Sequence, residues 1–360
     1  MALNKTSPHA YVVFIRRFLT FLLLLWSFLF ACVGIADSVS IAEQNRPQTL
    51  QDVPPTTLPI RLTDDRGRSV QLKHSAKRII SLSPSLTELM FEAGAGDKLV
   101  GVSRHSDYPD AAQRIPDIGD ASHLDLERIV ALKPDLVIAW RSGNTLSDIS
   151  KLEKLGLTVF STEAGRLEDI PRLLRVVGQL AGTSTQAEST AGDFEEVLQQ
   201  FRRNYGNRSK IRVFQLIWHQ PLMTINGSHI ISDLIELCGG VNIFASFPAL
   251  TPVISAENLL QADPQVIISS ISREFAESEV KALLRRFSHI SAVSNNHLYF
   301  VHPDLIHRQT ARITQAAKAV CGQLENVRST KGMHGDEVML PAGVTVKARE
   351  MSRNSREKFS

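Results

Sequence analysis

The sequence contains an internal duplication, and this feature limits the possible folds more than any other. Residues 126–140, LERIVALKPDLVIAW, have a counterpart in residues 256–270, AENLLQADPQVIISS. Each copy has an Asp or Ser two residues before a Glu, then an apolar pair, a Pro seven residues after the Glu, and an apolar run. Two halves built to one plan predict two similar lobes, and two lobes predict a cleft for a ligand.

A second, shorter match supports the duplication. Residues 87–90, TELM, lead to Gly94, and residues 232–235, SDLI, lead to Gly239 with the same internal spacing. The repeated plan therefore extends beyond one helix and one strand in each half.

Length and composition are those of a globular protein of two domains. The chain has 360 residues, of which 43% are hydrophobic and 21% charged. Its formal charge of +3 is too small to indicate a nucleic-acid partner, so none is predicted.

The first part of the chain has the pattern of an export signal. Basic residues precede an apolar run over residues 18–33, and small residues at positions 34 and 36 follow it. We interpret residues 1–36 as a secretory signal peptide, which predicts that the mature protein is exported. Two alternatives stay open. The run is close to membrane-spanning length and would serve as an uncleaved anchor. Lipid attachment at Cys32 is the other, although Phe30 fits a lipoprotein signal poorly.

The cysteine count agrees with export. Cys32 lies in the predicted signal, which leaves Cys238 and Cys321 as an even pair in an oxidising compartment. We predict a disulfide between them; the alternative is two buried free thiols. Neither cysteine has a neighbour at CxxC spacing, so a cysteine-based zinc site is not expected.

Apolar runs alternate with helical patterns and short loops, which predicts an α/β fold with parallel sheets. A β-hairpin is expected at 60–73. Strands are expected at 78–82, 99–102, 135–140, 158–160, 211–217, 266–269 and 298–301. Helices are expected from an N-cap at Thr87 to Gly94 or Gly96, after Asp125 up to Pro134, and at 149–155, 232–238, 257–261 and 310–324.

The pattern divides the chain into six segments. We expect a signal peptide at 1–36, a linker at 37–59, an N-terminal lobe at 60–183, a connecting helix at 184–206, a C-terminal lobe at 207–327 and a disordered tail at 328–360.

Several motifs together resemble a known family. They are RIISLSPSLTE at 78–88, SDYP at 106–109, the stretch 126–140, RVF at 212–214 and CGGVNIF at 238–244. They resemble the periplasmic substrate-binding proteins of ABC importers for iron chelates and vitamin B12, and most closely the cobalamin-binding proteins. The resemblance covers residues 76–325. The stretch ending in KPDLVIAW is specific, whereas the opening motif alone is not.

The resemblance implies a class III binding protein, with two Rossmann-like lobes joined by a single long helix and the ligand held between them. It implies a monomeric carrier, not an enzyme, without a cofactor of its own. The expected partners are a metal-chelate ligand and an ABC permease dimer with its ATPase subunits. It also supports the pairing of Cys238 with Cys321. A rigid connecting helix predicts little closure on binding.

Glu127 and Glu257 occupy the same place in the two copies. A carboxylate in the first turn of a helix is stabilised by the helix dipole by ~0.3–1 kcal/mol, which alone accounts for either residue. It does not require the same Glu in both lobes. The resemblance implies that each Glu pairs with arginines of the permease, and a matched pair suits a dimer with two-fold symmetry.

The predicted ligand-binding residues rest mainly on the resemblance. Trp140 ends a strand, where open α/β sheets bind ligands, and matches a pocket tryptophan of the family. The other residues implied at the pocket are His105, Tyr108, Met223, Asp304, His307 and Arg308.

The sequence departs from the cobalamin-binding pattern at several of these places. His105 replaces a Tyr, Met223 replaces a Phe, and His307 stands for Glu in an Asp-x-x-Glu-Arg run. Ala121 and Thr251 stand where that family has Trp. A corrin needs a broad apolar wall, so these losses make a ferric siderophore or haem an alternative ligand.

Two other functions are weaker interpretations. Direct binding of a bare metal ion would need about three His and a carboxylate, and no His-rich loop is present. His105 or His307 would instead meet the metal or polar rim of a chelate. A hydrolase using His105, Ser106 and Asp107 rests only on their adjacency.

Overall fold

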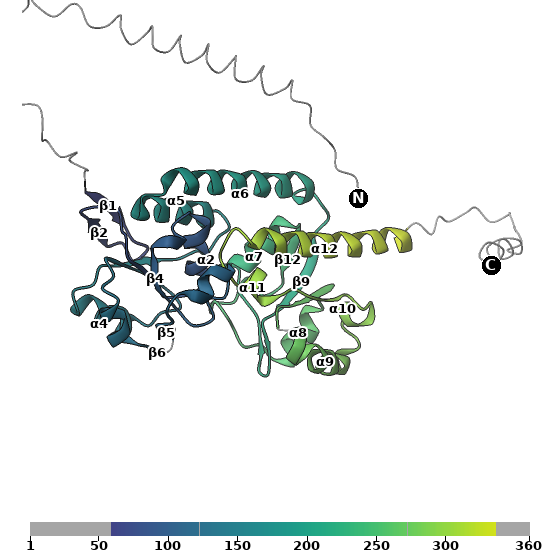
Figure 1. Cartoon of the computed structure of the whole chain (residues 1–360). Coiled ribbons are helices and arrows are strands. Elements are labelled where there is room, and N and C mark those ends of the chain that lie inside the picture. The colour runs from purple at the N-terminus through teal and green to yellow at the C-terminus, as the bar shows by residue number, and fades with distance from the viewer. Residues whose placement is uncertain (1–58, 122, 272, 336–360) are drawn as a thin grey trace, which may run out of the picture. The chain divides into compact units, whose positions relative to one another are not determined.

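A computed structural model describes residues 59–121, 123–271 and 273–335. The predicted signal peptide, all but the last residue of the predicted linker, and residues 336–360 of the predicted tail lie outside the described residues. Within them, the chain forms two lobes, each with a four-stranded parallel sheet and helices packed on its faces (Figure 1). The predicted α/β class with two lobes is confirmed.

The two sheets have the same topology. The N-terminal sheet has the order β4-β3-β7-β8 and the C-terminal sheet the order β12-β9-β13-β14. In each sheet, the strand that comes first in sequence lies between the second and the third, and the fourth lies at the edge beside the third. The strands are β3 Ile79–Ser81, β4 Leu99–Val102, β7 Leu136–Trp140, β8 Val159–Thr162, β9 Ile211–Leu216, β12 Gly240–Asn242, β13 Val266–Ser269 and β14 Leu298–Phe300.

Short antiparallel hairpins extend from both lobes. They are β1 Ile60–Thr63 with β2 Ser69–Leu72, β5 Gly119–Asp120 with β6 His123–Leu124, and β10 Trp218–His219 with β11 Leu222–Met223.

The helices fall into three groups. The N-terminal lobe has α2 Pro84–Glu92, α3 Leu126–Ala131, α4 Leu146–Lys154 and α5 Asp169–Ala181. The connecting helix is α6 Ser184–Tyr205. The C-terminal lobe has α7 Ile230–Leu237, α8 Ala256–Ala262, α9 Arg273–Leu284, α10 Ser291–Ser294, α11 Pro303–Ile306 and α12 Ile313–Gly335. Short 3₁₀ turns lie at Gly96–Lys98, Asp110–Arg114 and Arg285–Phe287.

The duplicated stretch has the same local structure in both lobes. Asp125 and Ser255 cap α3 and α8, each accepting the backbone N–H three residues later. Both helices are followed by a residue with positive φ, 47° at Lys133 and 38° at Asp263, and then by Pro and a buried strand. From residue 123 to 132 the sequence of exposed and buried positions equals that from 253 to 262. The internal repeat is therefore a repeat of structure.

The start of α2 differs from the prediction. Ser83, not Thr87, is its N-cap, because the Ser83 hydroxyl accepts the N–H of Leu86 and Pro84 occupies the first turn. Pro is favoured there since it lacks only an N–H that would have no partner in the helix. Thr87 is fully buried one turn later, and its hydroxyl bonds that of Ser81 at 2.6 Å.

Two further expectations change. The predicted disordered tail starts too early, because α12 continues through Gly335; only 336–360 lie outside the described residues.

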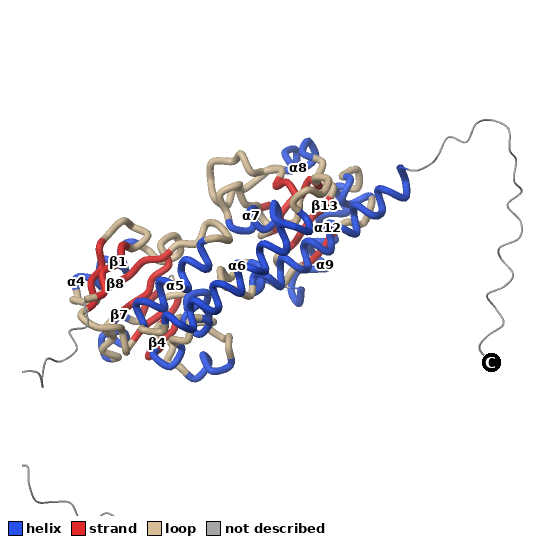
Figure 2. The backbone as a smooth tube through the Cα atoms, turned by 90° about the horizontal axis from the view of Figure 1, so that it is seen from above, coloured by secondary structure: helices blue, strands red, loops and turns tan. Residues whose placement is uncertain are grey.

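Helix α5 was not predicted. Pro171 interrupts its sequence pattern, but as the third residue it lies in the first turn, where it removes no helical hydrogen bond. Helix α5 lies along α6 in both views (Figures 1 and 2).

One hydrophobic cluster runs through both lobes. It joins one face of the N-terminal sheet to one face of the C-terminal sheet through the buried side of α6, including Phe194 and Leu198. Helices α7 and α12 contribute Leu234 and Val320 to the same cluster. The outer face of each sheet has its own smaller cluster, under α3 and α4 in one lobe and under α8 and α9 in the other. The two lobes therefore share one hydrophobic core, to which each sheet contributes one face.

The predicted disulfide is present. Cys238, at the end of α7, is bonded to Cys321 of α12, and both residues are fully buried. The bond fixes the last long helix to the sheet that it covers.

We expect loss of this disulfide to lower the free energy of unfolding by about 2–4 kcal/mol, because the unfolded chain would regain the freedom of a long loop. Urea unfolding of a Cys238→Ala/Cys321→Ala variant measures the change. Dithiothreitol should destabilise the native protein and leave this variant unaffected. Equal stability of the two proteins would contradict a structural role.

Candidate functional site

A buried carboxylate of the N-terminal lobe is bonded to the C-terminal lobe. The side chain of Glu88, on α2, has no exposed surface. Its Oε1 lies 2.5 Å from Arg308 Nη1 and 3.0 Å from Arg312 Nη1, and its Oε2 accepts the Thr310 hydroxyl at 3.2 Å. A carboxylate removed from water needs such partners, since its desolvation costs several kcal/mol. This cluster therefore holds the segment between α11 and α12 against α2.

The carboxylate that corresponds to Glu88 in the duplication belongs to the C-terminal lobe and is bonded to the N-terminal lobe. Asp233, on α7 of the C-terminal lobe, accepts the N–H of Leu167 at 2.8 Å and pairs with Arg166 at 3.0 Å. Residues 166 and 167 follow β8 in the N-terminal lobe. Each lobe thus bonds the other through the carboxylate at the second position of its own TELM or SDLI stretch.

Four of the predicted ligand-binding residues meet beside Glu88. Arg308 pairs with Asp304 at 3.1 Å and donates to the His105 carbonyl at 3.5 Å. The guanidinium of Arg312 lies 3.6 Å from the centre of the Tyr108 ring, a cation–π contact. Tyr108 is 44% exposed although its ring is large and apolar. Tyr108 and Asp304 thus offer apolar and charged surface near the junction of the lobes.

Asp107 completes this cluster and was not predicted as a ligand residue. It lies 2.7 Å from Arg308 Nη1. Partial burial alone would raise its pKa, but the pairing with Arg308 outweighs burial and holds the pKa of Asp107 below its ordinary value. Ser106 bonds Thr87 at 2.9 Å and Ser103 at 3.3 Å. These bonds engage Ser106 and Asp107 with other partners, and the hydrolase alternative still rests only on the adjacency of its three residues.

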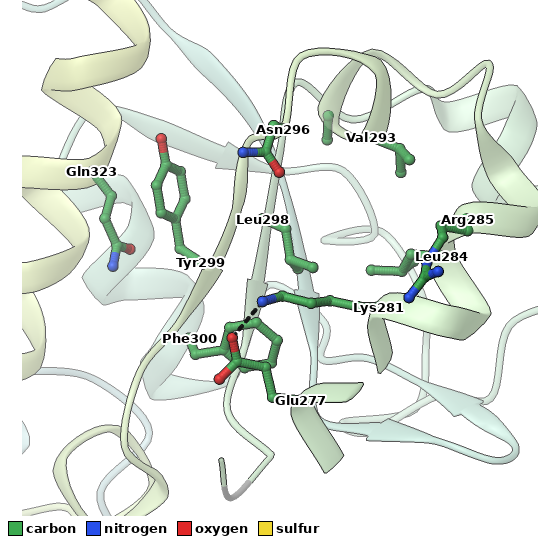
Figure 3. Close-up of a pocket in the computed structure, with 11 residues that line it drawn as sticks. Glu277, Lys281, Leu284, Arg285, Val293, Asn296, Leu298, Tyr299, Phe300 and Gln323 are labelled. Atoms are coloured by element: carbon green, nitrogen blue, oxygen red, sulfur yellow. Dashed lines mark hydrogen bonds and ion pairs between the residues drawn. The ribbon is translucent and has the colours of Figure 1, made fainter. Parts of the chain in front are cut away.

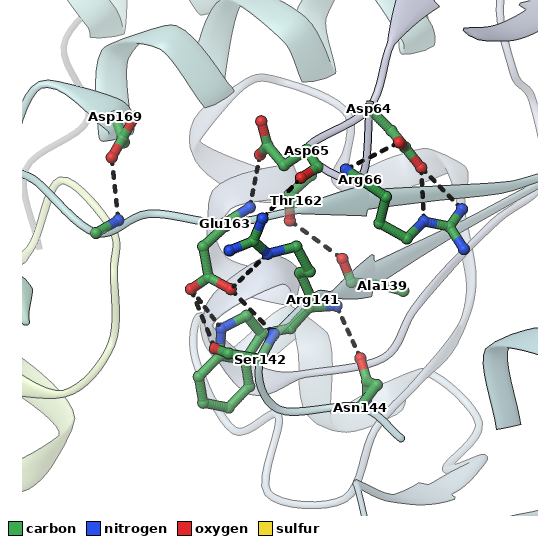
Figure 4. Close-up of polar contacts among 12 residues, drawn as sticks. Asp64, Asp65, Arg66, Ala139, Arg141, Ser142, Asn144, Thr162, Glu163 and Asp169 are labelled. Carbon is green, nitrogen blue, oxygen red and sulfur yellow. Dashed lines mark hydrogen bonds and ion pairs between the residues drawn. The ribbon is translucent and has the colours of Figure 1, made fainter. Parts of the chain in front are cut away.

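Trp140 belongs to a separate group, at the carboxyl end of β7. Its indole N–H donates to Glu163 Oε1 at 3.2 Å. Glu163 also accepts the backbone N–H of Ser142 at 2.9 Å and its hydroxyl at 3.1 Å (Figure 4). A Cβ on Gly143 would lie 1.8 Å from the indole ring, so the ring packs directly on the glycine backbone. Glu163 and Gly143 therefore fix the orientation of Trp140, which is partly exposed.

His307 and His229 form a third group. His307 Nε2 lies 2.7 Å from the Ser270 hydroxyl, which accepts from Gln215. Burial lowers the pKa of His307 although Asp304 opposes this. Burial and the nearby His307 lower the pKa of His229 to about 4. Two neutral imidazoles close to the lobe junction suit a polar or metal contact with a ligand better than an anion contact.

Met223 lies on the β10–β11 hairpin, and its cross-strand partner is a residue that the sequence analysis missed. Trp218 pairs with Met223 and is 50% exposed. Its indole N–H donates to the Gln220 carbonyl at 2.9 Å. The adjacent His219 is tied to Glu279 of α9 at 3.0 Å, which fixes the hairpin. The sequence signal that could have pointed to Trp218 is an aromatic residue next to the short apolar stretch of this hairpin.

The neighbouring strand-like segment adds apolar surface. Val253 forms an isolated bridge with Met223 and is 58% exposed, and Leu250 is 43% exposed. The C-terminal lobe therefore presents an apolar surface of Trp218, Met223, Leu250 and Val253, although Thr251 lacks the expected aromatic ring.

The two predicted docking residues are not part of these groups. Glu127 and Glu257 are the second residues of α3 and α8 and are exposed. Hydrogen bonds from its own backbone and from the Ser255 hydroxyl lower the pKa of Glu257, which is therefore ionised. A hollow of about 440 Å³ lies beside Glu127, lined also by Arg104, Asp117 and Arg128.

Another hollow, of about 430 Å³, lies between α9 and β14 (Figure 3). Its lining includes Leu284, Tyr299 and the ion pair of Glu277 with Lys281 at 2.6 Å. The predicted ligand-binding residues are not among its lining residues.

Across residues 59–121, 123–271 and 273–335, no group of three or more His, Cys, Asp or Glu is arranged to hold a metal ion. In the same part of the chain, no helix is both long and apolar enough to cross a membrane.

Comparison with known proteins decides the family. A family model described as periplasmic binding protein matches residues 79–305. The chain belongs to the periplasmic binding protein family. A vitamin B12-binding protein of Vibrio parahaemolyticus is 34% identical over 252 residues, which are 70% of this chain and 90% of that relative.

Solved structures agree with the family. The periplasmic vitamin B12 binding protein of Vibrio cholerae is 34% identical with a TM-score of 0.65, covering 70% of this chain and 98% of that one. A periplasmic haem-binding protein in complex with two haems shares the fold at 21% identity and a TM-score of 0.63, over 71% of this chain and 99% of that one. The predicted family and its fold are therefore confirmed.

As a periplasmic binding protein, the chain is a carrier that takes a small molecule to a membrane permease. The roles of its predicted ligand and docking residues stay predictions.

Burial raises the pKa of a carboxyl group at the contact between the lobes. Glu92, the last residue of α2, accepts the N–H of Ala311 at 3.0 Å. Burial raises the pKa of Glu92 from 4.5 to about 7, and the nearby Glu88 adds to the rise, while Ala311 and Arg312 oppose it.

We expect this group to make the folded protein less stable as the pH rises from about 4.5 to 7. In that window the folded state keeps a proton that the unfolded chain has released, at a cost of up to roughly 3 kcal/mol above pH 7. Urea unfolding across this range should show a smaller decline for Glu92→Gln than for the native protein. Glu196→Gln, at an exposed position of α6, is the control. Parallel pH profiles of Glu92→Gln and the native protein would contradict the assignment.

Proposed function

We propose that the protein is exported and captures a corrinoid, with vitamin B12 as the first candidate, between its lobes, and delivers it to an ABC permease dimer. The observation that carries the proposal is the 34% identity to a vitamin B12-binding protein over 90% of that relative's length. Capture needs no catalytic group, and energy for import would come from the ATPase subunits.

The residues near the lobe junction support a broad, mostly apolar ligand. Trp140 and Tyr108 belong to the N-terminal lobe and Trp218 to the C-terminal lobe, and all three keep exposed or partly exposed rings. A corrin has large apolar faces and an amide rim, which suits aromatic walls with a few polar groups. Asp304 and His302 supply polar surface next to Arg308.

A ferric siderophore or haem is the second candidate. The neutral imidazoles of His307 and His229 favour it, because a neutral ring nitrogen can ligate iron. His307 has its Nε2 occupied by Ser270, so iron binding there would need that hydrogen bond to break or the other nitrogen to act.

Calorimetry should show one cyanocobalamin bound per protein, without turnover. Trp140→Ala and Trp218→Ala should each weaken binding about tenfold, since each removes an aromatic contact with the ligand. Leu146→Ala, at an apolar side chain 69% exposed on α4, is the matched control and should bind normally. Tighter binding of haemin or ferrichrome would replace the corrinoid with the second candidate. Failure of all three ligands would refute the carrier function.

The docking residues are tested separately. In cells, Glu127→Ala/Glu257→Ala should abolish uptake of cyanocobalamin while its calorimetric affinity stays unchanged, because both carboxylates lie outside the ligand-binding groups. Asp193→Ala/Glu196→Ala, exposed carboxylates of α6, should leave uptake normal. Normal uptake by the first variant would show that the permease contacts another surface.

A further inference from the structure

Each docking glutamate has an exposed apolar neighbour at the same place in its lobe. Val130 on α3 is 43% exposed, and Leu260 on α8 is 45% exposed. Each lies three residues after its Glu, a spacing that puts the two side chains on one face of a helix. Thus Glu127 with Val130, and Glu257 with Leu260, form an acidic and apolar pair on each lobe.

The helices hold these pairs in fixed orientation. Ile129 and Leu259, the residues just before Val130 and Leu260, have no exposed surface and anchor α3 and α8 in the outer clusters. The capping side chains of Asp125 and Ser255 fix the first turn of each helix. Because both helices are anchored and capped alike, the paired side chains leave each lobe in the same local geometry.

Comparison of the two copies separates these positions from the other exposed ones. Arg128 corresponds to Asn258, and Ala131 corresponds to Gln261, so these exposed positions differ in charge or polarity. By contrast, both copies have a Glu and, three residues later, an exposed aliphatic residue. A single exposed aliphatic residue is ordinary on a protein surface. Two at matched positions, each beside a matched carboxylate, indicate a shared partner.

We propose that Val130 and Leu260 are apolar contacts of the permease docking surface, each seated in a recess beside the cationic group that meets Glu127 or Glu257. The inference rests on the proposed function. Its partner is a membrane protein of two equivalent subunits, because one lobe presents the same pair as the other. A bilayer surface does not fit, since anionic lipid headgroups would repel both carboxylates.

The physical role of the aliphatic side chains is to keep water from the ion pairs. An exposed pair of a carboxylate with a guanidinium contributes little in water and is weakened by salt. Apolar surface packed beside it excludes solvent and adds attraction that salt does not screen. The two residues should therefore dominate docking at high ionic strength.

The test measures binding of the purified exported protein to a cobalamin permease–ATPase complex from the same cells, held in lipid nanodiscs. Val130→Ser/Leu260→Ser should weaken binding about tenfold or more in 0.1 M salt, and the relative loss should persist in 0.5 M salt. The conservative variant Val130→Ile/Leu260→Ile, which keeps both side chains aliphatic, should bind the permease complex like the native protein. Leu146→Ser/Leu155→Ser, which removes apolar side chains exposed by 69% and 53%, is the matched control.

The outcomes separate this inference from the proposed function. If the Ser variant binds like the control while Glu127→Ala/Glu257→Ala loses binding, the apolar contacts are refuted and the docking glutamates stand. If both pairs of variants bind normally, the docking surface itself is wrong. If the Ser variant loses binding to empty nanodiscs to the same degree, the contact is with lipid and the proposal is overturned. Cyanocobalamin affinity, measured in parallel, should not change.

Discussion

Burial of the Glu88 carboxylate is the constraint on which the arrangement of the lobes depends. A charge without exposed surface is tolerated only with close partners, and its partners, Arg308 and Arg312, come from the other lobe. Asp233 makes the reciprocal connection to Arg166 and Leu167. Separation of the lobes would leave these groups unpaired, so the ion pairs set which loops face each other.

The shared core acts in the same direction as the ion pairs. The cluster that includes Phe194 and Leu198 of α6 continues into both sheets, so the lobes cannot open widely without exposing apolar surface. The expectation of little closure on ligand binding stays a prediction. Side chains such as Trp140, held by Glu163 and Gly143, are therefore already fixed in place within their lobe.

The parts of the fold that could be predicted depend on local sequence. The caps Asp125 and Ser255, the buried strands that follow the repeated Pro, and the pair Cys238 and Cys321 are visible in short stretches or in a count. The start of α2 was misplaced because Thr87 resembles a cap, whereas Ser83 followed by Pro is the stronger signal. Helix α5 was not predicted; its Pro171 lies in the first turn, where Pro is compatible with a helix.

Parts of the candidate site could not be predicted, because they arise from contacts between distant segments. Glu88 and Arg308 are 220 positions apart, and no local pattern pairs them. Trp218 became visible as a candidate only through its exposure and its pairing with Met223. Helices α3 and α8, which carry Glu127 and Glu257, could by contrast be located from sequence because the duplication marks them twice.

The positions of the tryptophans have a practical consequence. Within the described residues the indoles are Trp140 and Trp218, one in each lobe, and each is at least partly exposed at the end of a strand or on a hairpin. If the proposed function is right, a coloured ligand held between them would absorb emission from both. Replacing either indole with Phe would leave an intrinsic optical probe in a known lobe, so that the approach of a ligand to each wall can be followed without attaching a dye.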